Sequence, residues 1–231
     1  MPGGEPPPPR QRRGPPPGPG EDLRGRHIIV TAGPTQEPID PVRVIANRSS
    51  GKQGFAIAQA LAERGARVTL VAGPVALHTP AGVDRVDVET AAQMQAAVDA
   101  ALPADAAVMV AAVADWAVEA APEKLKKSAG PPELRWRANP DILAELARSE
   151  RRPLLLIGFA AETKNVAEAA GEKRLRKGAD WILANDVSGD VMGGDDNEIH
   201  LITAEGEEVW AKAPKAEIAR RLARRIADAL A

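Results

Sequence analysis

Two groups of lysines have the type and spacing to bind a polyanion. Lys124, Lys126 and Lys127 lie within four residues, and Lys173 and Lys177 lie four apart, on one face of a predicted helix. Ammonium groups are point charges suited to phosphates. The alternatives are ordinary ones, because a lysine run is usually a solvated face and a helix end favours cations in any protein. We therefore expect a local anion site or a charged surface.

The segment after the first predicted strand combines serines and glycines before a helix. Ser49 or Ser50 can cap this helix and Gly51 allows close backbone approach, so the helix start can present unpaired N–H groups to an anion. An ordinary capped helix is the alternative. The sequence does not fit a P-loop, because Ala46 and Gln53 occupy the positions of its first glycine and its hydroxyl residue. The Gly-x-Gly-x-x-Gly dinucleotide motif is also absent after this strand.

Further candidate residues follow other predicted strands. Asp115 and Trp116 come after the apolar run 106–112, and Phe159 ends the run 154–159. Because parallel strands end at one edge of a sheet, these residues should meet where such folds bind ligands. Asp115 can accept from a base or sugar or help to hold a metal, and Phe159 can stack; a turn residue and a core residue are the alternatives. The three histidines have no metal-ligand spacing, and no Ser-His-Asp triad is evident.

The elements that must position these residues are short apolar runs that alternate with helix-like stretches, as in βα units. Strands are expected at residues 27–31, 67–72, 85–88, 106–112, 154–159 and 181–184, with a hairpin at 198–203 and 207–210. Helices are expected at 51–64, 91–102, 140–148, 166–177 and 214–230. Most strand runs are continuously apolar, which indicates burial on both faces. The predicted fold class is α/β, a Rossmann-like mainly parallel sheet with helices on both faces and a late β-hairpin.

Composition excludes several classes of function. The 231 residues contain no cysteine, which rules out thiol nucleophiles, zinc–thiolate sites, iron–sulfur clusters and redox pairs. A net charge of −2 gives no support for broad nucleic-acid binding. There is no long apolar run and no signal-peptide pattern, so a cytoplasmic chain without a membrane segment is expected.

The first 20 residues include 14 prolines and glycines. Such a segment cannot pack a core, so residues 1–26 are predicted to be a disordered linker or tail and residues 27–231 a single folded domain. A linker of a longer protein and an ordinary tail without a role both remain open.

Seven segments, in order, resemble phosphopantothenate-cysteine ligases, in the bacterial form that is usually the carboxyl-terminal half of a bifunctional protein of coenzyme A biosynthesis. The segments are 31–43, 47–52, 111–115, 122–127, 139–142, 158–163 and 184–187. The resemblance implies that the carboxylate of 4'-phosphopantothenate attacks the α-phosphate of CTP and releases pyrophosphate. The amine of L-cysteine then displaces CMP from the acyl-cytidylate to give 4'-phosphopantothenoylcysteine.

The resemblance also implies roles for individual residues. Asn47 would contact the acyl-nucleotide intermediate, and Lys124 would meet the nucleotide; both would be catalytic. Nucleotide contacts are implied for Ala111, Ala112, Val113, Asp115, Pro140, Asp141, Ile142, Leu143, Phe159, Lys173 and Lys177. For the substrate phosphate we expect Arg43, Ser50 and the backbone at Gly51.

The cofactors and partners implied are Mg²⁺, held mainly by the nucleotide phosphates with Asp115 as a candidate ligand, and CTP as co-substrate, without a flavin. A homodimer is implied, with the loop 36–46 and the late hairpin as candidate interfaces. So is a fused or separate phosphopantothenoylcysteine decarboxylase. Neither nucleic acid nor membrane is expected as a partner. Two rivals remain: an NAD(P)-dependent oxidoreductase and a non-catalytic nucleotide-binding module on the same fold.

Overall fold

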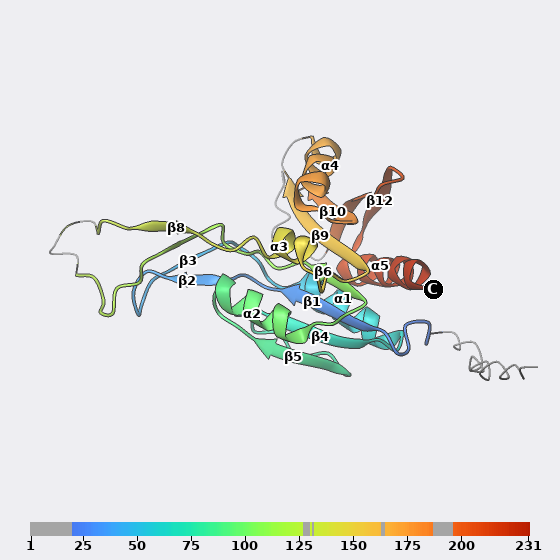
Figure 1. The fold of residues 1–231 in the computed structure, drawn as a ribbon, viewed down its shortest axis with the longest axis horizontal. Helices are drawn as coiled ribbons and strands as arrows, with labels where there is room; N and C mark the ends of the chain where they lie inside the picture. The colour runs from blue at the N-terminus through green and yellow to red at the C-terminus, as the bar shows by residue number, and fades with distance from the viewer. Residues whose placement is uncertain (1–19, 127–129, 131, 163–164, 187–195) are drawn as a thin grey trace, which may run out of the picture.

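The computed structural model describes residues 20–126, 130, 132–162, 165–186 and 196–231. Its main sheet has eight strands in the order β12-β11-β10-β9-β6-β1-β4-β5 (Figure 1). The parallel strands are β1 (His27–Ala32), β4 (Arg67–Ala72), β5 (Val83–Asp87), β6 (Ala106–Met109), β9 (Leu155–Glu162) and β10 (Trp181–Asp186). A late hairpin, β11 (Asp196–Ile202) and β12 (Glu207–Pro214), extends one edge in antiparallel pairing.

Helices cover both faces of this sheet. They are α1 (Lys52–Glu63), α2 (Ala91–Ala101), α3 (Ile142–Arg148), α4 (Val166–Lys177) and α5 (Lys215–Leu230). In the central strand β1, Ile28 and Val30 pack toward α1 and α5, whereas Ile29 packs toward α2 and α3. All six residues of β1 are buried, as the continuous apolar run at residues 28–30 predicts; the buried polar residues His27 and Thr31 flank this run. The predicted fold class, including the helices on both faces and the late hairpin, is confirmed.

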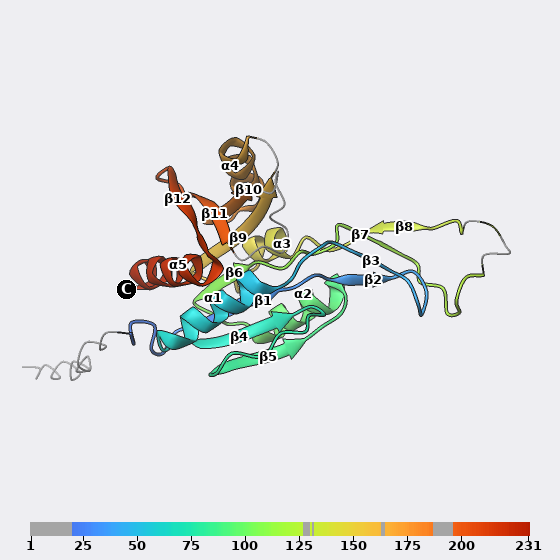
Figure 2. The same ribbon diagram turned by 180° about the vertical axis from the view of Figure 1, so that it is seen from behind.

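A long arm projects from this body and was not predicted from the sequence. It consists of two small antiparallel pairs of strands, β2 (Gln36–Pro38) with β3 (Val44–Ala46) and β7 (Trp116–Val118) with β8 (Trp136–Ala138). The described residues that connect the two strands within each pair also belong to it. Figures 1 and 2 show all four strands on the same side, extending away from the main sheet. We refer to this extension as the arm.

The packed body begins before His27. Leu23 is fully buried in the core, and its N–H donates to the Arg64 carbonyl oxygen at 3.0 Å. Leu23, which lies in the predicted linker 1–26, therefore belongs to the folded part of the chain. Residues 1–19 lie outside the described residues. Of the helices described, none has the length and apolar character needed to cross a membrane.

Candidate functional site

An open cavity of about 1180 Å³ lies at the carboxyl ends of β1, β6 and β9. The chain builds the sheet outward in one direction through β4 and β5 and then in the other through β6, β9 and β10. The carboxyl ends of β1 and β6 therefore flank the topological switch point, where open α/β sheets bind ligands. The cavity is where the sequence predicted the polar strand-end residues to meet.

Two threonine hydroxyls fix the loop that follows β6. Thr31 Oγ1 accepts hydrogen bonds from the N–H groups of Val110, at 3.1 Å, and Ala111, at 3.2 Å. Thr35, which is fully buried, accepts from the Ala114 N–H at 2.9 Å. Both threonines come from the end of β1 and the residues after it, so the first strand holds the loop in place. The small side chains of residues 111–113 line the cavity beside this backbone.

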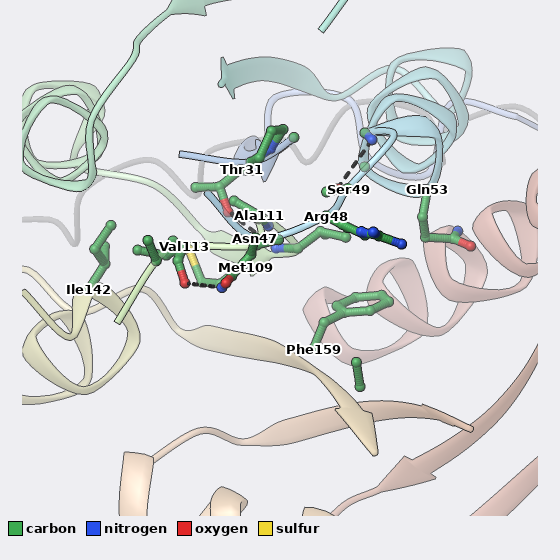
Figure 3. A pocket seen from close by; sticks show the side chains of 18 of the residues that line it. Thr31, Asn47, Arg48, Ser49, Gln53, Met109, Ala111, Val113, Ile142 and Phe159 are labelled. Atoms are coloured by element: carbon green, nitrogen blue, oxygen red, sulfur yellow. Dashed lines mark hydrogen bonds between the residues drawn. The ribbon is translucent and has the colours of Figure 1, made fainter. Parts of the chain in front are cut away.

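Asn47 connects the arm to the same loop. It follows β3, and its Nδ2 donates to the Val113 carbonyl oxygen at 2.9 Å (Figure 3). Within the described residues, this bond leaves the second amide hydrogen and the amide oxygen for a ligand in the cavity. Asn47 is thus placed to fix two cavity loops and to donate or accept at their centre.

Arg48 was not singled out from the sequence, although it lies in a segment on which the resemblance rests. Its side chain extends from the loop after β3 into the space between Gln53 and Phe159 (Figure 3). No salt bridge joins it to another residue of the described part of the chain. A guanidinium in this position can bind a phosphate or carboxylate bidentately.

The start of α1 forms one wall of the cavity. Gly51 is the N-cap, with φ of +73°, and no described side chain caps the first turn. The predicted capping by Ser49 or Ser50 is therefore wrong; Ser49 Oγ instead accepts from the Gly51 N–H at 3.3 Å. Gly54 is needed for packing, because a Cβ there would lie 2.5 Å from the Ala32 Cβ. The helix consequently begins directly against the end of β1, with its first N–H groups toward the cavity.

The opposite wall carries Lys173 and Lys177 from α4. Lys173 Nζ donates to the Phe159 carbonyl oxygen at 2.9 Å, and Lys177 forms an ion pair with Asp141. Asp141 also caps α3, because its Oδ1 accepts from the Ala144 N–H at 3.2 Å. Burial raises the pKa of Asp141, but the hydrogen bonds from Lys177 and Ala144 and the charges of Lys177 and Arg148 outweigh it and lower this pKa below its ordinary value. The carboxylate is therefore ionised at neutral pH.

Most of the predicted site residues line this one cavity. They are Asn47, Ser50, Gly51, Ala111, Ala112, Val113, Asp115, Pro140, Asp141, Ile142, Leu143, Phe159, Lys173 and Lys177. Arg43 and Lys124 do not line it; both belong to the arm. Of the motif residues, Lys127, Thr163 and Val187 lie outside the described residues.

Several polar cavity residues carried no predicted role: Arg48, Gln53, Asn139, Asn185, Asn197 and Lys215. Asn139 was quoted in a motif, and it holds the cavity loop by donating to the Ala114 carbonyl oxygen at 2.8 Å. Asn197 and Lys215 lie far along the chain and reach the cavity only through the fold. Asn197 Nδ2 donates to Gln53 Oε1 at 3.0 Å, which ties the late hairpin to α1.

One cavity carboxylate, that of Asp115, can help to hold a metal ion, whereas the carboxylate of Asp141 is paired with Lys177. In the described part of the chain, no three His, Asp or Glu side chains gather to hold a metal ion by themselves. Asp115 is exposed on the cavity wall. Because Mg²⁺ in nucleotide sites is usually held by one or two carboxylates together with substrate phosphates, Asp115 fits as a ligand.

The sequence also matches a known protein family. The family described as DNA/pantothenate metabolism flavoprotein C-terminal domain matches residues 23–230. The coenzyme A biosynthesis bifunctional protein CoaBC of Escherichia coli K12 is 50% identical over 198 residues, which are 83% of this chain and 49% of that protein. The chain thus spans about half the length of this curated relative.

Solved structures show the same fold. The crystal structure of the C-terminal domain of a CoaBC protein matches with a TM-score of 0.76 and 38% identity, over 91% of this chain and 98% of that one. A Cab2 variant in complex with phosphopantothenate-cysteine matches with a TM-score of 0.71 at 15% identity, over 90% and 88% of the two chains. By its sequence, this chain belongs to the DNA/pantothenate metabolism flavoprotein C-terminal domain family.

Proposed function

We propose that this chain is a phosphopantothenate-cysteine ligase, which uses CTP to join 4'-phosphopantothenate to L-cysteine through an acyl-cytidylate. The observation that carries the proposal is the single cavity that gathers Asn47, the backbone loop 110–114 and the lysines of α4. Half of the residues aligned with the E. coli CoaBC protein are identical. The volume of the cavity in this chain, about 1180 Å³, exceeds the roughly 300–1,000 Å³ that is usual for a small-molecule site. A cavity of this size suits two substrates bound together.

The nucleotide would occupy the side formed by the loop and α4. Residues 111–113 allow the cytosine and ribose to lie against the backbone. Because the N–H groups of Ala111 and Ala112 already donate within the chain, the edge of the base would be read by the Val113 N–H and by carbonyl oxygens, which can each accept a second bond. Lys173 and Lys177 would neutralise the phosphates, and Asp115 would take part in holding Mg²⁺. Bound there, Mg²⁺ supplies charge neutralisation on the phosphate oxygens.

The acyl group would lie near Asn47. There an amide N–H of Asn47 would donate to the acyl oxygen, where charge builds when the cysteine amine attacks. Arg48, Ser50 and the first N–H groups of α1 would bind the phosphate of 4'-phosphopantothenate. The protein would then act by orienting two anions and neutralising their charge, which is the contribution this chemistry requires.

Lys124 requires a second subunit in this proposal. It lies on the arm and does not line the cavity of its own chain, yet the resemblance makes it essential at the nucleotide. The arm also exposes Trp116 and Trp136, whose side chains are 56% and 59% accessible. We infer a homodimer in which apolar arm residues bury one another and each arm carries Lys124 to the partner's cavity.

The wider setting of the reaction follows from the relatives. Because the curated relatives are bifunctional and about twice as long, we propose that a decarboxylase, fused or separate, consumes the product. The carboxylate of the newly joined cysteine would be its substrate. We also propose that the enzyme acts in the cytoplasm, in keeping with this metabolic role.

Pyrophosphate release provides the test. The full chain with Mg²⁺, CTP and 4'-phosphopantothenate should release pyrophosphate, and CMP and the amide should appear only when L-cysteine is added. ATP in place of CTP and omission of 4'-phosphopantothenate are the controls. If no product forms in a nucleotide-dependent way, the chain would instead be a non-catalytic nucleotide-binding module. A thermal shift with NADPH but none with CTP would favour the oxidoreductase.

A further inference from the structure

Asp40 is a buried carboxylate at the turn of the arm between β2 and β3. Its side chain is 0% accessible, although acidic residues are rarely buried without a partner. Oδ1 accepts from the N–H groups of Val42 and Arg43, both at 2.9 Å. These two bonds complete an ordinary turn of the Asx type, so they account for one carboxylate oxygen.

The second oxygen serves another segment. Asp40 Oδ2 accepts from the Leu125 N–H at 3.1 Å and pairs with the Arg43 guanidinium at 2.8 Å. Arg43 Nη2 in turn donates to the Leu125 carbonyl oxygen at 2.5 Å. Leu125 is 85 residues from Asp40 in sequence and lies between Lys124 and Lys126, so both polar groups of its peptide backbone are held.

A further backbone bond reinforces this connection, from the Ala121 N–H to the Ile39 carbonyl oxygen at 2.9 Å. Burial raises the pKa of Asp40, but the N–H groups of Val42, Leu125 and Arg43 and the charge of Arg43 outweigh it and lower this pKa. The carboxylate is therefore ionised at neutral pH and holds all four partners at once. Neither Asp40 nor Arg43 lines the cavity, so their direct role is with the arm.

We propose that Asp40 is a positioning residue for Lys124, fixing the segment 121–126 on the arm so that the lysine is presented in one orientation. The role assigned to Lys124 rests on the proposed ligase function. Arg43 then acts as the second half of this clamp, rather than as the phosphate ligand that the sequence suggested. Positioning matters because a displacement of about 1 Å in a reacting group can cost about a hundredfold in rate.

Limited proteolysis tests the clamp independently of activity. Asp40→Asn keeps the size of the side chain but removes its charge, so trypsin should cut after Lys124 and Lys126 several-fold faster than in the parent, with fragments identified by mass spectrometry. Asp105→Asn is the matched control: Asp105, which is partly buried, likewise pairs with an arginine, Arg26, but at the other end of the sheet. That variant should leave cleavage at the two lysines unchanged.

Kinetics then test the link to Lys124. Asp40→Asn should slow pyrophosphate release by about ten- to a hundredfold. The double variant Asp40→Asn, Lys124→Ala should be no slower than Lys124→Ala alone, since both substitutions act through the Lys124 side chain. Because Asp40→Asn breaks a buried network, Arg43→Met provides a second variant that keeps the carboxylate and its backbone bonds. It should accelerate cleavage at the lysines to a smaller extent.

Parental cleavage rates in both clamp variants would overturn the proposal, and so would additive losses in the double variant. A fully active Lys124→Ala enzyme would instead refute the role given to Lys124 in the proposed function. The cleavage rates would still decide whether Asp40 holds the segment, so the two failures can be told apart.

Discussion

Asn47 combines a structural contact with the role proposed for it at the acyl group, and replacing it by alanine removes both. Its bond to Val113 is structural, whereas its remaining amide groups face the cavity. We expect Asn47→Ala to keep pyrophosphate release but to form amide about a hundredfold more slowly, because one oxyanion donor is typically worth that much. Acyl-cytidylate should accumulate, measured as pyrophosphate produced in excess of CMP. Gln59→Ala, on the outer part of α1, is the control, and amide formation at the parental rate would refute the role of Asn47.

The Asp141–Lys177 pair predicts a pH dependence of stability. Because the folded-state pKa of Asp141 is lowered, the pair stabilises the protein above the unfolded pKa of about 4 and loses this contribution as pH falls through the folded value. Lys177→Met should therefore lower the free energy of unfolding at pH 7 by no more than about 1 kcal/mol, since both side chains are partly exposed.

Urea unfolding at several pH values checks this expectation. The difference between the parent and Lys177→Met should shrink below about pH 4, where Asp141 becomes protonated in both proteins. Lys212→Met, at an exposed position of β12, is the control and should show no such trend. A difference that stays constant down to acid pH would mean that the ion pair contributes nothing.

At the scale of elements, the loop after β6 depends on the end of β1. Thr35→Val keeps the shape of the side chain but leaves the Ala114 N–H without its acceptor, at a cost of about 1–3 kcal/mol. We expect the KM for CTP to rise about tenfold as the loop loses its fixed position. Equilibrium unfolding and initial rates at varied CTP give the two quantities.

Thr90→Val is the matched control for this loop. Thr90 caps α2 by accepting from the Gln93 N–H at 3.2 Å, so its loss should cost about 1 kcal/mol of stability. The KM for CTP should stay at its parental value, because Thr90 does not line the cavity. An equal change in KM for both variants would mean that Thr35 acts only through global stability.

The two kinds of strand show what the sequence could predict about the fold. Most of the parallel strands of the main sheet were predicted because they contain continuous apolar runs between helical stretches. Each arm strand has only three residues, and Pro38 and Pro41 interrupt the pattern of the first pair. The pairing of these short strands, and the single side chain of Asp40 at the turn of the first pair, fix them in place. Neither produces a pattern that can be seen in the sequence.

The same distinction applies to the candidate site. Residues directly after predicted strands, such as Asp115 and Phe159, could be placed at one edge of the sheet from the sequence alone. Asn197 and Lys215 reach the cavity only through the packing of the late hairpin and α5 against α1, which no local pattern records. The position of Lys124 away from its own cavity is likewise a property of the arm, and no spacing of residues indicates it.

At the scale of the whole molecule, the exposed apolar surface of the arm is where we expect two subunits to associate. Val42 and Val44 are 63% and 44% accessible, on the same arm as the two exposed tryptophans. We expect Trp136→Glu to shift the protein toward a monomer in analytical ultracentrifugation, because a buried unpaired charge opposes association. Leu175→Glu, which alters an exposed residue of α4 instead, should leave the assembly unchanged.

Mixing two variants that each form little amide tests whether the sites are shared between subunits. If Lys124 acts in the partner's cavity, a heterodimer of Asn47→Ala and Lys124→Ala chains contains one site with both lesions and one intact site. Random reassembly of equal amounts makes half of the dimers heterodimers, so about a quarter of the sites should become active. Ligase activity measured after co-refolding gives this fraction. If Lys124 instead served its own subunit, each site would carry one lesion and mixing would restore nothing, and the arm would then have to fold back to reach the cavity of its own chain.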